Sequence, residues 1–392
     1  MQASKIQAGF AALSIVVLLM TACGGGGGGG TTTGTSTVLS AYVANYGDGT
    51  ILQYTVNPST GALMPKSPAT ICAVPPQTTP CTNYDPQSIT VDPAGKYAYV
   101  ANSLAGISQF TIGPGGVLQP MNPATVPWGS YASSPTSVAI DPSGKYLYAV
   151  NSAGSEVAQF IIDPTNGTLT SMSTPTVCTF SLCALNASAY AYITVDPTGN
   201  YVYVADQGNN LVEEFSIGSG GGLTYKGSVA TGTSPISIAI DPADNNAYVV
   251  NYGNPSTITQ YSIASGLLTS KAITGGAGTQ LVNATSITID HSGSFAYVAS
   301  GSGLFQLPIT SVTGTLSIPS SVAAIWTGGT PVQSVAIDAS GKFVFVANQS
   351  SSTYTTGSVS QFSIGAGGAL SNPVETPAGN QAYFITTAAS IQ

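Results

Sequence analysis

The sequence has no arginine and a single histidine, His291, and only 6% of its 392 residues are charged. Its formal net charge is -8 at pH 7, and all seven basic residues are lysines. Proteins that bind nucleic acid or anionic membrane surfaces need clustered cations, so this composition argues against both as partners. Helical patterns are also missing, because no stretch keeps the apolar spacing of a helix for more than a turn or two. We therefore expect an almost helix-free protein.

A repeated strand is the strongest positive feature of the chain. An aromatic, apolar segment ends in Val-Ala-Asn or a near copy seven times, at intervals of 45 to 57 residues. The last residues of these segments are Asn45, Asn102, Asn151, Asp206, Asn251, Ser300 and Asn348. This period is typical of the four-stranded blade of a β-propeller and too long for most helical repeats.

Each repeat carries two further marks. An apolar run closes on Asp-Pro-x-Gly or a variant before the aromatic strand, which predicts a tight turn capped by the aspartate. These aspartates are Asp92, Asp141, Asp196, Asp241, Asp290 and Asp338. A third strand follows, and in each repeat it contains Gln, or Glu once, followed by an aromatic or apolar residue. These Gln and Glu residues are Gln53, Gln109, Gln159, Glu214, Gln260, Gln306 and Gln361. We interpret the Gln series as a structural ladder with one charged variant, Glu214.

The chain ends predict how the ring closes. The first repeat begins at its second strand, and the terminal segment 381–388 aligns with 190–197, which is an innermost strand. The C-terminal strand would therefore complete the N-terminal blade and remove an exposed sheet edge. The predicted fold is all-β: one seven-bladed propeller of four-stranded antiparallel blades over residues 38–392.

The N-terminal residues resemble the signal of a bacterial lipoprotein. Lys5 precedes an apolar stretch from Ala8 to Met20, and Thr-Ala-Cys follows, ending at Cys23. We predict a signal peptide over residues 1–22 and a lipidated Cys23, although a plain secretory cut near Ala22 is the alternative. A membrane-spanning anchor would need a longer apolar run.

The predicted anchor also gives the protein an address. Residues 23–37 hold seven consecutive Gly and then Thr, Gly and Ser, so they form a flexible linker. Gly24 follows the cysteine where an Asp would resemble an inner-membrane retention signal, which favours the outer membrane or cell surface. The membrane would be a partner through the lipid alone.

Four further cysteines fall into two close pairs in the two longest repeats. Cys72 and Cys81 form one pair, and Cys178 and Cys183 form the other. Local disulfides are the simplest of three pairings, and an exported protein permits them. A metal site is disfavoured because neither pair has Cys-x-x-Cys spacing or a nearby histidine.

The repeats resemble a known group. Tyr-Val-Ala-Asn together with Asp-Pro-x-Gly-Lys-Tyr, at Asp92 to Tyr97 and Asp141 to Tyr146, is similar to YVTN-type repeats, and the layout resembles the seven-bladed lactonase family. This resemblance implies a propeller and 6-phosphogluconolactonase-like or related lactone chemistry. No catalytic residue of the family can be placed on a matching position, because the chain lacks Arg and His291 lies in an Asp-Pro turn on the face opposite the usual ligand face.

The loop-rich face carries the candidate site. We predict ligand contacts there from acidic and aromatic residues: Asp48, Tyr84, Asp85, Trp128, Tyr131, Tyr190, Asp206 and Tyr252. Such a mouth could bind sugars, or a divalent cation such as calcium through oxygen ligands. Asp85 and Asp206 are the candidate catalytic acids; Asp85 has no evident counterpart in the other repeats. Glu213-Glu214 is noted because it breaks the Gln pattern.

Two functions remain open at this stage. The first is a tethered, monomeric binding or scaffold module for a glycan, a peptide or another envelope protein. The second is a lactone hydrolase that uses acidic residues or a bound cation. A phosphorylated substrate is the least suitable, because nothing replaces Arg for phosphate.

Overall fold

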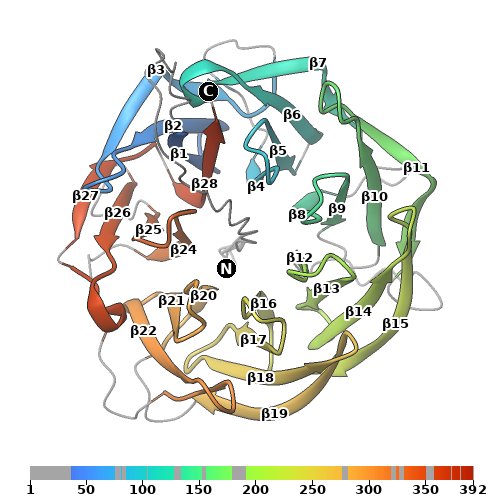
Figure 1. Cartoon of the computed structure of the whole chain (residues 1–392), viewed down its shortest axis with the longest axis vertical. Helices are drawn as coiled ribbons and strands as arrows, with labels where there is room; N and C mark the ends of the chain where they lie inside the picture. Colours follow the sequence, from blue (N-terminus) through green and yellow to red (C-terminus); the bar gives the residue numbers. More distant parts are fainter. Residues whose placement is uncertain are drawn as a thin grey trace, which may run out of the picture.

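Seven antiparallel sheets of four strands each surround a central axis in the computed structural model of the protein (Figure 1). The structure describes residues 37–75, 81, 85–103, 105–127, 134–151, 156–178, 191–275, 281–318, 324–325, 331–349, 357–371, 373–379 and 381–391. In these residues the only helical segments are two 3-10 turns, η1 (Pro114–Gly116) and η2 (Ala366–Gly368). None of the described helices is long and apolar enough to cross a membrane. The predicted all-β seven-bladed propeller is confirmed.

Each sheet is one blade, and the first two strands of each blade lie nearest the axis (Figure 1). The inner strands of blades 1 to 7 are β28 (Ala382–Ile391), β4 (Pro86–Val91), β8 (Pro135–Ile140), β12 (Ala191–Val195), β16 (Pro235–Ile240), β20 (Ala284–Ile289) and β24 (Val332–Ile337). The second strands are β1 (Thr37–Asn45), β5 (Tyr97–Asn102), β9 (Tyr146–Asn151), β13 (Tyr201–Asp206), β17 (Asn246–Asn251), β21 (Phe295–Ser300) and β25 (Phe343–Asn348).

The third and fourth strands complete each blade towards its outer edge. The third strands are β2 (Thr50–Val56), β6 (Gly106–Ile112), β10 (Glu156–Ile162), β14 (Leu211–Ile217), β18 (Thr257–Ala264), β22 (Gly303–Thr310) and β26 (Ser358–Ser363). The outer strands are β3 (Leu63–Cys72), β7 (Leu118–Val126), β11 (Leu169–Cys178), β15 (Leu223–Ala230), β19 (Leu267–Gly275), β23 (Thr315–Leu316) and β27 (Val374–Pro377).

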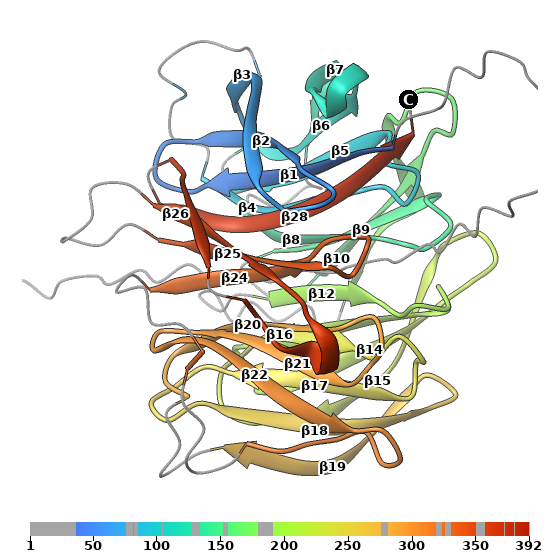
Figure 2. The same ribbon diagram turned by 60° about the vertical axis from the view of Figure 1, so that its left-hand side comes forward.

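The two ends of the chain meet in blade 1. Strand β28 pairs antiparallel with β1 from Thr37 opposite Ile391 to Asn45 opposite Ala382, and Figure 2 shows the two strands side by side. The C-terminal strand thus completes the first blade, as the sequence predicts.

The Asp-Pro turns join the inner strands to the second strands. In blade 2, Asp92 Oδ1 accepts hydrogen bonds from the backbone N–H groups of Lys96 and Tyr97, both at 2.6 Å. The other five aspartates of the series make the same pair of bonds. We call the side of the ring that carries these turns the turn face, and the opposite side, where the second strands end, the loop face.

Tyrosine hydroxyls tie neighbouring blades together. The Tyr99 hydroxyl of blade 2 donates to the carbonyl oxygen of Gly167 in blade 3 at 2.5 Å. Five more seams repeat this bond, from Tyr42, Tyr148, Tyr203, Tyr248 and Tyr297 to Gly116, Gly221, Gly266, Gly314 and Gly368. In the seam between blades 7 and 1 the equivalent residue is Phe345, which has no hydroxyl.

The Gln series forms a second ladder across the same seams. The side-chain oxygen of Gln53 accepts a hydrogen bond from the backbone N–H of Leu118 in the next blade at 2.7 Å. Gln109, Gln159 and Gln260 accept in the same way from Leu169, Leu223 and Leu316. The expected structural role of this series is confirmed for these members.

Lysine replaces an aromatic ring in two seams. Five second strands begin with an aromatic residue whose ring packs against a glycine of the next blade. A Cβ atom added to that glycine would lie only 2.1 to 2.4 Å from the ring. These aromatic residues are Tyr97, Tyr146, Tyr201, Phe295 and Phe343. In blades 1 and 5 the equivalent residues are Ser40 and Asn246. There the amines of Lys66 and Lys271 extend from the outer strands and donate to backbone carbonyls of the next blade, at 2.6 and 2.7 Å.

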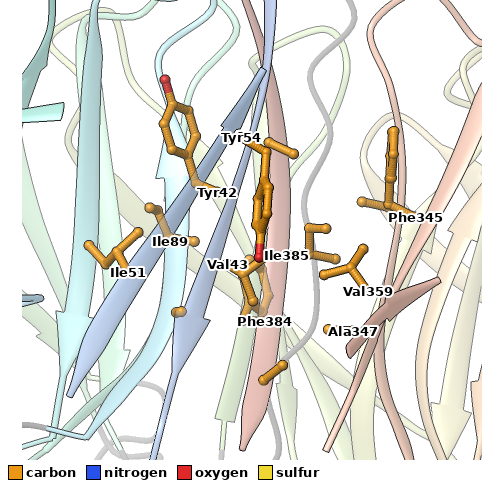
Figure 3. Close-up of a cluster of buried hydrophobic side chains, with 14 of the residues drawn as sticks. Tyr42, Val43, Ile51, Tyr54, Ile89, Phe345, Ala347, Val359, Phe384 and Ile385 are labelled. Atoms are coloured by element: carbon orange, nitrogen blue, oxygen red, sulfur yellow. The ribbon is translucent and has the colours of Figure 1, made fainter. Parts of the chain in front are cut away.

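The hydrophobic core is divided among the seams. Blade 1 packs against blades 2 and 7 through a cluster that includes Tyr42, Ile89 and Phe345 (Figure 3). The second strand of blade 1 is fully buried from Ala41 to Ala44. Because both faces of each sheet are covered near the axis, the inner and second strands do not alternate between apolar and polar residues.

The tyrosine ladder yields a stability prediction. Replacing Tyr99 with Phe would leave the buried Gly167 carbonyl without its donor, so we expect a loss of about 1 to 3 kcal/mol in the free energy of unfolding. Replacing Phe345 with Tyr would supply the missing donor in the remaining seam, and we expect a gain of up to about 1 kcal/mol. Denaturant unfolding of both variants measures the two effects, and a loss in Phe345→Tyr as large as that in Tyr99→Phe would contradict this account.

Candidate functional site

Most residues that end the second strands serve the fold. On the loop face, Asn102 Nδ2 donates to the Ser108 hydroxyl on the third strand at 3.0 Å. The same cross-strand bond joins Asn251 to Thr259 and Asn348 to Ser360, both at 2.9 Å. These asparagines are buried. In these three blades an amide on the second strand therefore donates a hydrogen bond to a hydroxyl on the third strand.

Blade 4 replaces this neutral pair with two carboxyl groups. Asp206 ends β13 where five other blades have Asn and blade 6 has Ser300. Glu213 lies opposite Val204, just as Ser108 lies opposite Val100. Asp206 and Glu213 are 2% and 0% exposed. Every second residue of a strand lies on the same face of the sheet. Asp206 therefore points to the same side as Val204, and Glu213 to the same side as Phe215. That side is the seam between blades 3 and 4. We call them the Asp206–Glu213 pair.

The turn after β13 holds the Asp206 carboxylate. Its Oδ1 accepts hydrogen bonds from the backbone N–H groups of Gly208 and Asn209 at 2.9 and 3.1 Å. Its Oδ2 accepts one from the side-chain amide of Asn209 at 2.7 Å. A carboxylate has about four acceptor positions. Asp206 is therefore fixed in orientation and can still accept a proton.

Glu213 has the opposite surroundings. Neither of its carboxyl oxygens has a hydrogen-bond partner of acceptable geometry among the described residues. Burial raises the pKa of Glu213 to about 7, and the negative charges of Asp206 and Glu214 add to the rise. The neighbouring Tyr225 offsets part of the rise without reaching hydrogen-bond geometry. Asp206 thus has three hydrogen-bond donors, whereas the neighbouring Glu213 has none among the described residues.

Glu214, by contrast, belongs to the structural ladder. Its Oε1 accepts a hydrogen bond from the backbone N–H of Leu268 in blade 5 at 2.5 Å, just as the glutamines do elsewhere. Burial raises its pKa. The side chains of Glu213 and Glu214 point to opposite faces of the sheet, so the break in the pattern noted in the sequence consists of two unrelated features.

Asp85 lies between blades 1 and 2 on the loop face. Its φ of 37° looks exceptional, but Ser234, Asn283 and Gln381, which also precede inner strands, have φ of 50° to 57°. In each case the backbone carbonyl accepts a bond from the chain that follows the second strand. The expectation that Asp85 has no counterpart in the other repeats is therefore wrong for its backbone. Burial raises the pKa of its carboxyl, and a hydrogen bond with Tyr46 partly offsets the rise.

The other predicted contact residues are spread around the ring. Asp48 accepts hydrogen bonds from the backbone and hydroxyl of Thr50, so it shapes a turn. Tyr252 is half-buried against the core of blades 5 and 6, and burial raises its pKa. The aromatic residues Tyr84, Trp128, Tyr131 and Tyr190 lie outside the described residues. The predicted aromatic rim stays a prediction.

The structure joins only some of the predicted residues. Asp206 and Glu213 come together, whereas Asp85 and Asp206 share no hydrogen bond in the described part of the chain. Sequence reasoning singled out Asp206 and the Glu213-Glu214 dipeptide separately and missed that two of these residues form a pair. The available signal was the residue immediately before each member of the Gln series, because only blade 4 has an acidic residue there. In chain order these residues are Leu52, Ser108, Ala158, Glu213, Thr259, Phe305 and Ser360.

One disulfide is present among the described residues. Cys72 and Cys81 are bonded, with Cα atoms 5.3 Å apart, as predicted. Cys178 ends β11, but Cys183 and Cys23 lie outside the described residues, so the second pairing and the lipidation stay predictions. The described residues bring no three His, Cys, Asp or Glu side chains together as metal ligands. The calcium hypothesis gains no site there.

The described cations lie away from the loop face. Lys96, Lys145 and Lys342 follow the Asp-Pro turns, Lys66 and Lys271 extend into seams, and Lys226 lies on the outer strand β15. His291 lies in its turn on the turn face, where burial lowers its pKa. A Cβ on Gly341 of the next turn would lie 2.6 Å from His291 Nδ1, so the ring packs where the other turns have Pro.

The sequence matches a family model described as "Lactonase, 7-bladed beta-propeller" over residues 35–185 and 174–282. No curated protein matches it. A putative 6-phosphogluconolactonase from Bacteroides uniformis is 16% identical, with a TM-score of 0.70 over 90% of this chain and 99% of its own. A periplasmic gluconolactonase from Pseudomonas aeruginosa is also 16% identical, with a TM-score of 0.65 over 90% and 99%. At this identity the two structures show a shared fold.

The ladder role of Glu214 can be tested by restoring the residue of the other blades. We expect Glu214→Gln to keep the bond to Leu268 and to change the free energy of unfolding at neutral pH by no more than about 1 kcal/mol, because an amide needs no costly ionisation. Denaturant unfolding measures it. A large loss would show that the carboxyl of Glu214 has a role that glutamine cannot replace.

Proposed function

Because the chain belongs to the seven-bladed β-propeller lactonase family, we propose that it is a lactone hydrolase in which Asp206 is the general base. The observation that carries this proposal is the Asp206–Glu213 pair, since blade 4 replaces the neutral amide and hydroxyl of other blades with two buried carboxyl groups. Neighbouring buried carboxyl groups with unlike hydrogen bonding are a mark of acid–base sites.

The proposed reaction uses water as its only other reactant. The Asp206 carboxylate takes a proton from water while the water oxygen bonds to the lactone carbonyl carbon. The bond from that carbon to the ring oxygen then breaks, and the ring oxygen receives the proton from Asp206. The product is an open-chain hydroxy acid, and the carboxylate is restored.

The charge distribution favours an uncharged lactone. Phosphate recognition relies on Arg or Lys. The sequence has no Arg, and each described lysine lies in a seam, in a turn or on an outer strand. A neutral lactone therefore suits the loop face better than a phosphorylated one. The binding or scaffold function gains no comparable support, because four of the five aromatic residues on which it depends lie outside the described part of the chain, and the fifth, Tyr252, is half-buried against the core of blades 5 and 6.

The proposal predicts hydrolysis of a neutral sugar lactone such as gluconolactone by the full chain. We expect Asp206→Asn to lower kcat/KM about 100-fold or more, because a positioned general base contributes about 10² to 10⁴. Asp48→Asn, a change of the same kind in another turn of the loop face, should leave the rate within about twofold. Titration of the released acid at constant pH measures the hydrolysis rate of the wild type and of both variants.

Three results would count against this proposal. Equal activity in Asp206→Asn and the wild type would remove Asp206 as the base, and a loss confined to Asp85→Asn would move the site to the seam between blades 1 and 2. Absence of turnover with neutral and phosphorylated lactones, in a folded protein, would remove the hydrolase proposal itself.

The proposed enzyme would act outside the cytoplasm, tethered by a lipid on Cys23. We expect labelled fatty acid to be incorporated into the wild-type chain in a bacterial host and not into Cys23→Ser, which should leave the membrane fraction. Cys72→Ser is the matched control, because it removes a different cysteine and should still be labelled. Equal labelling of Cys23→Ser would refute the anchor and leave the proposed reaction untouched.

A further inference from the structure

The Asp206–Glu213 pair leaves one buried carboxyl without compensation. Glu213 is 0% exposed, and neither of its oxygens has a hydrogen-bond partner among the described residues. An ionised carboxylate in such a place loses its hydration without gaining hydrogen bonds or a counter-ion, which is among the most costly arrangements in a protein. Asp206, on the neighbouring strand β13, has three donors.

The groups around Glu213 offer it no positive charge. Asp206 approaches from β13, Tyr225 from β15, and Glu214 is adjacent on the same strand. Blade 3 contributes Val157 and Met172 to the shared cluster and Tyr148, whose hydroxyl donates to the Gly221 carbonyl. These titratable neighbours are carboxyl and phenol groups, none of which carries a positive charge, so a proton is the simplest way to neutralise Glu213.

We propose that the Asp206–Glu213 pair shares a single proton, held on Glu213, and that the hydrolytic site works only in this one-proton form. Only the second part of this inference, the effect on hydrolysis, rests on the proposed function. Glu213 is a positioning residue, which acts through Asp206. In its neutral form it adds no second negative charge beside the oxyanion that forms on the lactone carbonyl.

The physical cost of losing this proton sets the pH dependence. Burial raises the pKa of Glu213 to about 7 from a usual value of 4.5, so the pair would lose its proton near neutral pH. A second charge then repels the developing oxyanion, and the rate falls. The hydrolytic rate should therefore decrease on the alkaline side with the ionisation of a residue that does not contact the substrate.

The kinetic arm compares the wild type with Glu213→Gln, which is neutral at every pH and similar in shape. From about pH 6 to about pH 8.5, kcat/KM of the wild type should fall roughly 30-fold, as expected for one group with a pKa near 7. Glu213→Gln should lack this fall. Glu214→Gln is the matched control, because it removes the adjacent carboxyl and should retain the fall.

The stability arm needs no substrate. The folded pKa of Glu213 lies above its unfolded value, so the native state binds more protons and the wild type loses stability as pH rises from about 4.5 to about 7. Glu213→Gln lacks this loss, and its melting temperature relative to the wild type should rise by roughly a few degrees across that window. The double variant Asp206→Asn with Glu213→Thr recreates the Asn251–Thr259 pair of blade 5 and should show the same trend.

The two arms separate the inference from the proposed function. Turnover by the wild type with an identical alkaline fall in Glu213→Gln would overturn the role of Glu213 in catalysis. A constant difference in melting temperature across the pH window, in both Glu213→Gln and the double variant, would overturn the shared proton. A changing difference without any turnover would support the shared proton and refute the hydrolase.

Discussion

The seam between neighbouring blades is the constraint on which this structure depends. A four-stranded sheet has two apolar faces and cannot cover either one by itself, so each blade is stable only between two others. Packing alone would allow the sheets to slide or splay. The tyrosine bonds to glycine carbonyls and the Gln bonds to leucine N–H groups fix the orientation of each blade against the next. Because the ring is closed, a misoriented blade at one seam would have to be accommodated by shifts at the other seams.

Much of this packing was predictable because the residues that form the seam recur at fixed positions of the repeat. The Asp-Pro turns, the strand order and the pairing of the last strand with the first follow from residue types that recur at fixed positions. The disulfide between Cys72 and Cys81 follows from the proximity of the two residues in one inserted loop. Local chemistry and repetition were sufficient for these features, since each repeat independently supports the same interpretation.

Other features depend on contacts between positions that the repeat does not align. The amine of Lys66 fills the space of an aromatic ring that Ser40 cannot fill, and the two residues lie on different strands. Burial there lowers the pKa of Lys66 to about 8. Likewise, Asp206 and Glu213 meet only through the register of β13 and β14. The sequence shows each residue, but the diagonal contact depends on strand pairing.

The repeat also serves as an internal reference for function. Asp85 seemed unusual in the sequence, yet its backbone repeats in three other blades. Glu214 seemed unusual because of its charge, yet it accepts the same hydrogen bond as its neutral equivalents. The Asp206–Glu213 pair is different, since acids replace both partners of the cross-strand bond and neither oxygen of the buried Glu213 carboxyl has a hydrogen bond within the described part of the chain. A structural role alone gives no reason for this exchange.

The pairing of β28 with β1 has a consequence for synthesis of the chain. Translation produces β1 before β28, so the first blade has three strands until β28 has left the ribosome. During that time the inner edge of β1 offers free backbone N–H and C=O groups to any other extended segment. Nascent chains should therefore need protection from one another, and a premature stop codon near the C-terminus should yield a protein that aggregates although every other blade is intact.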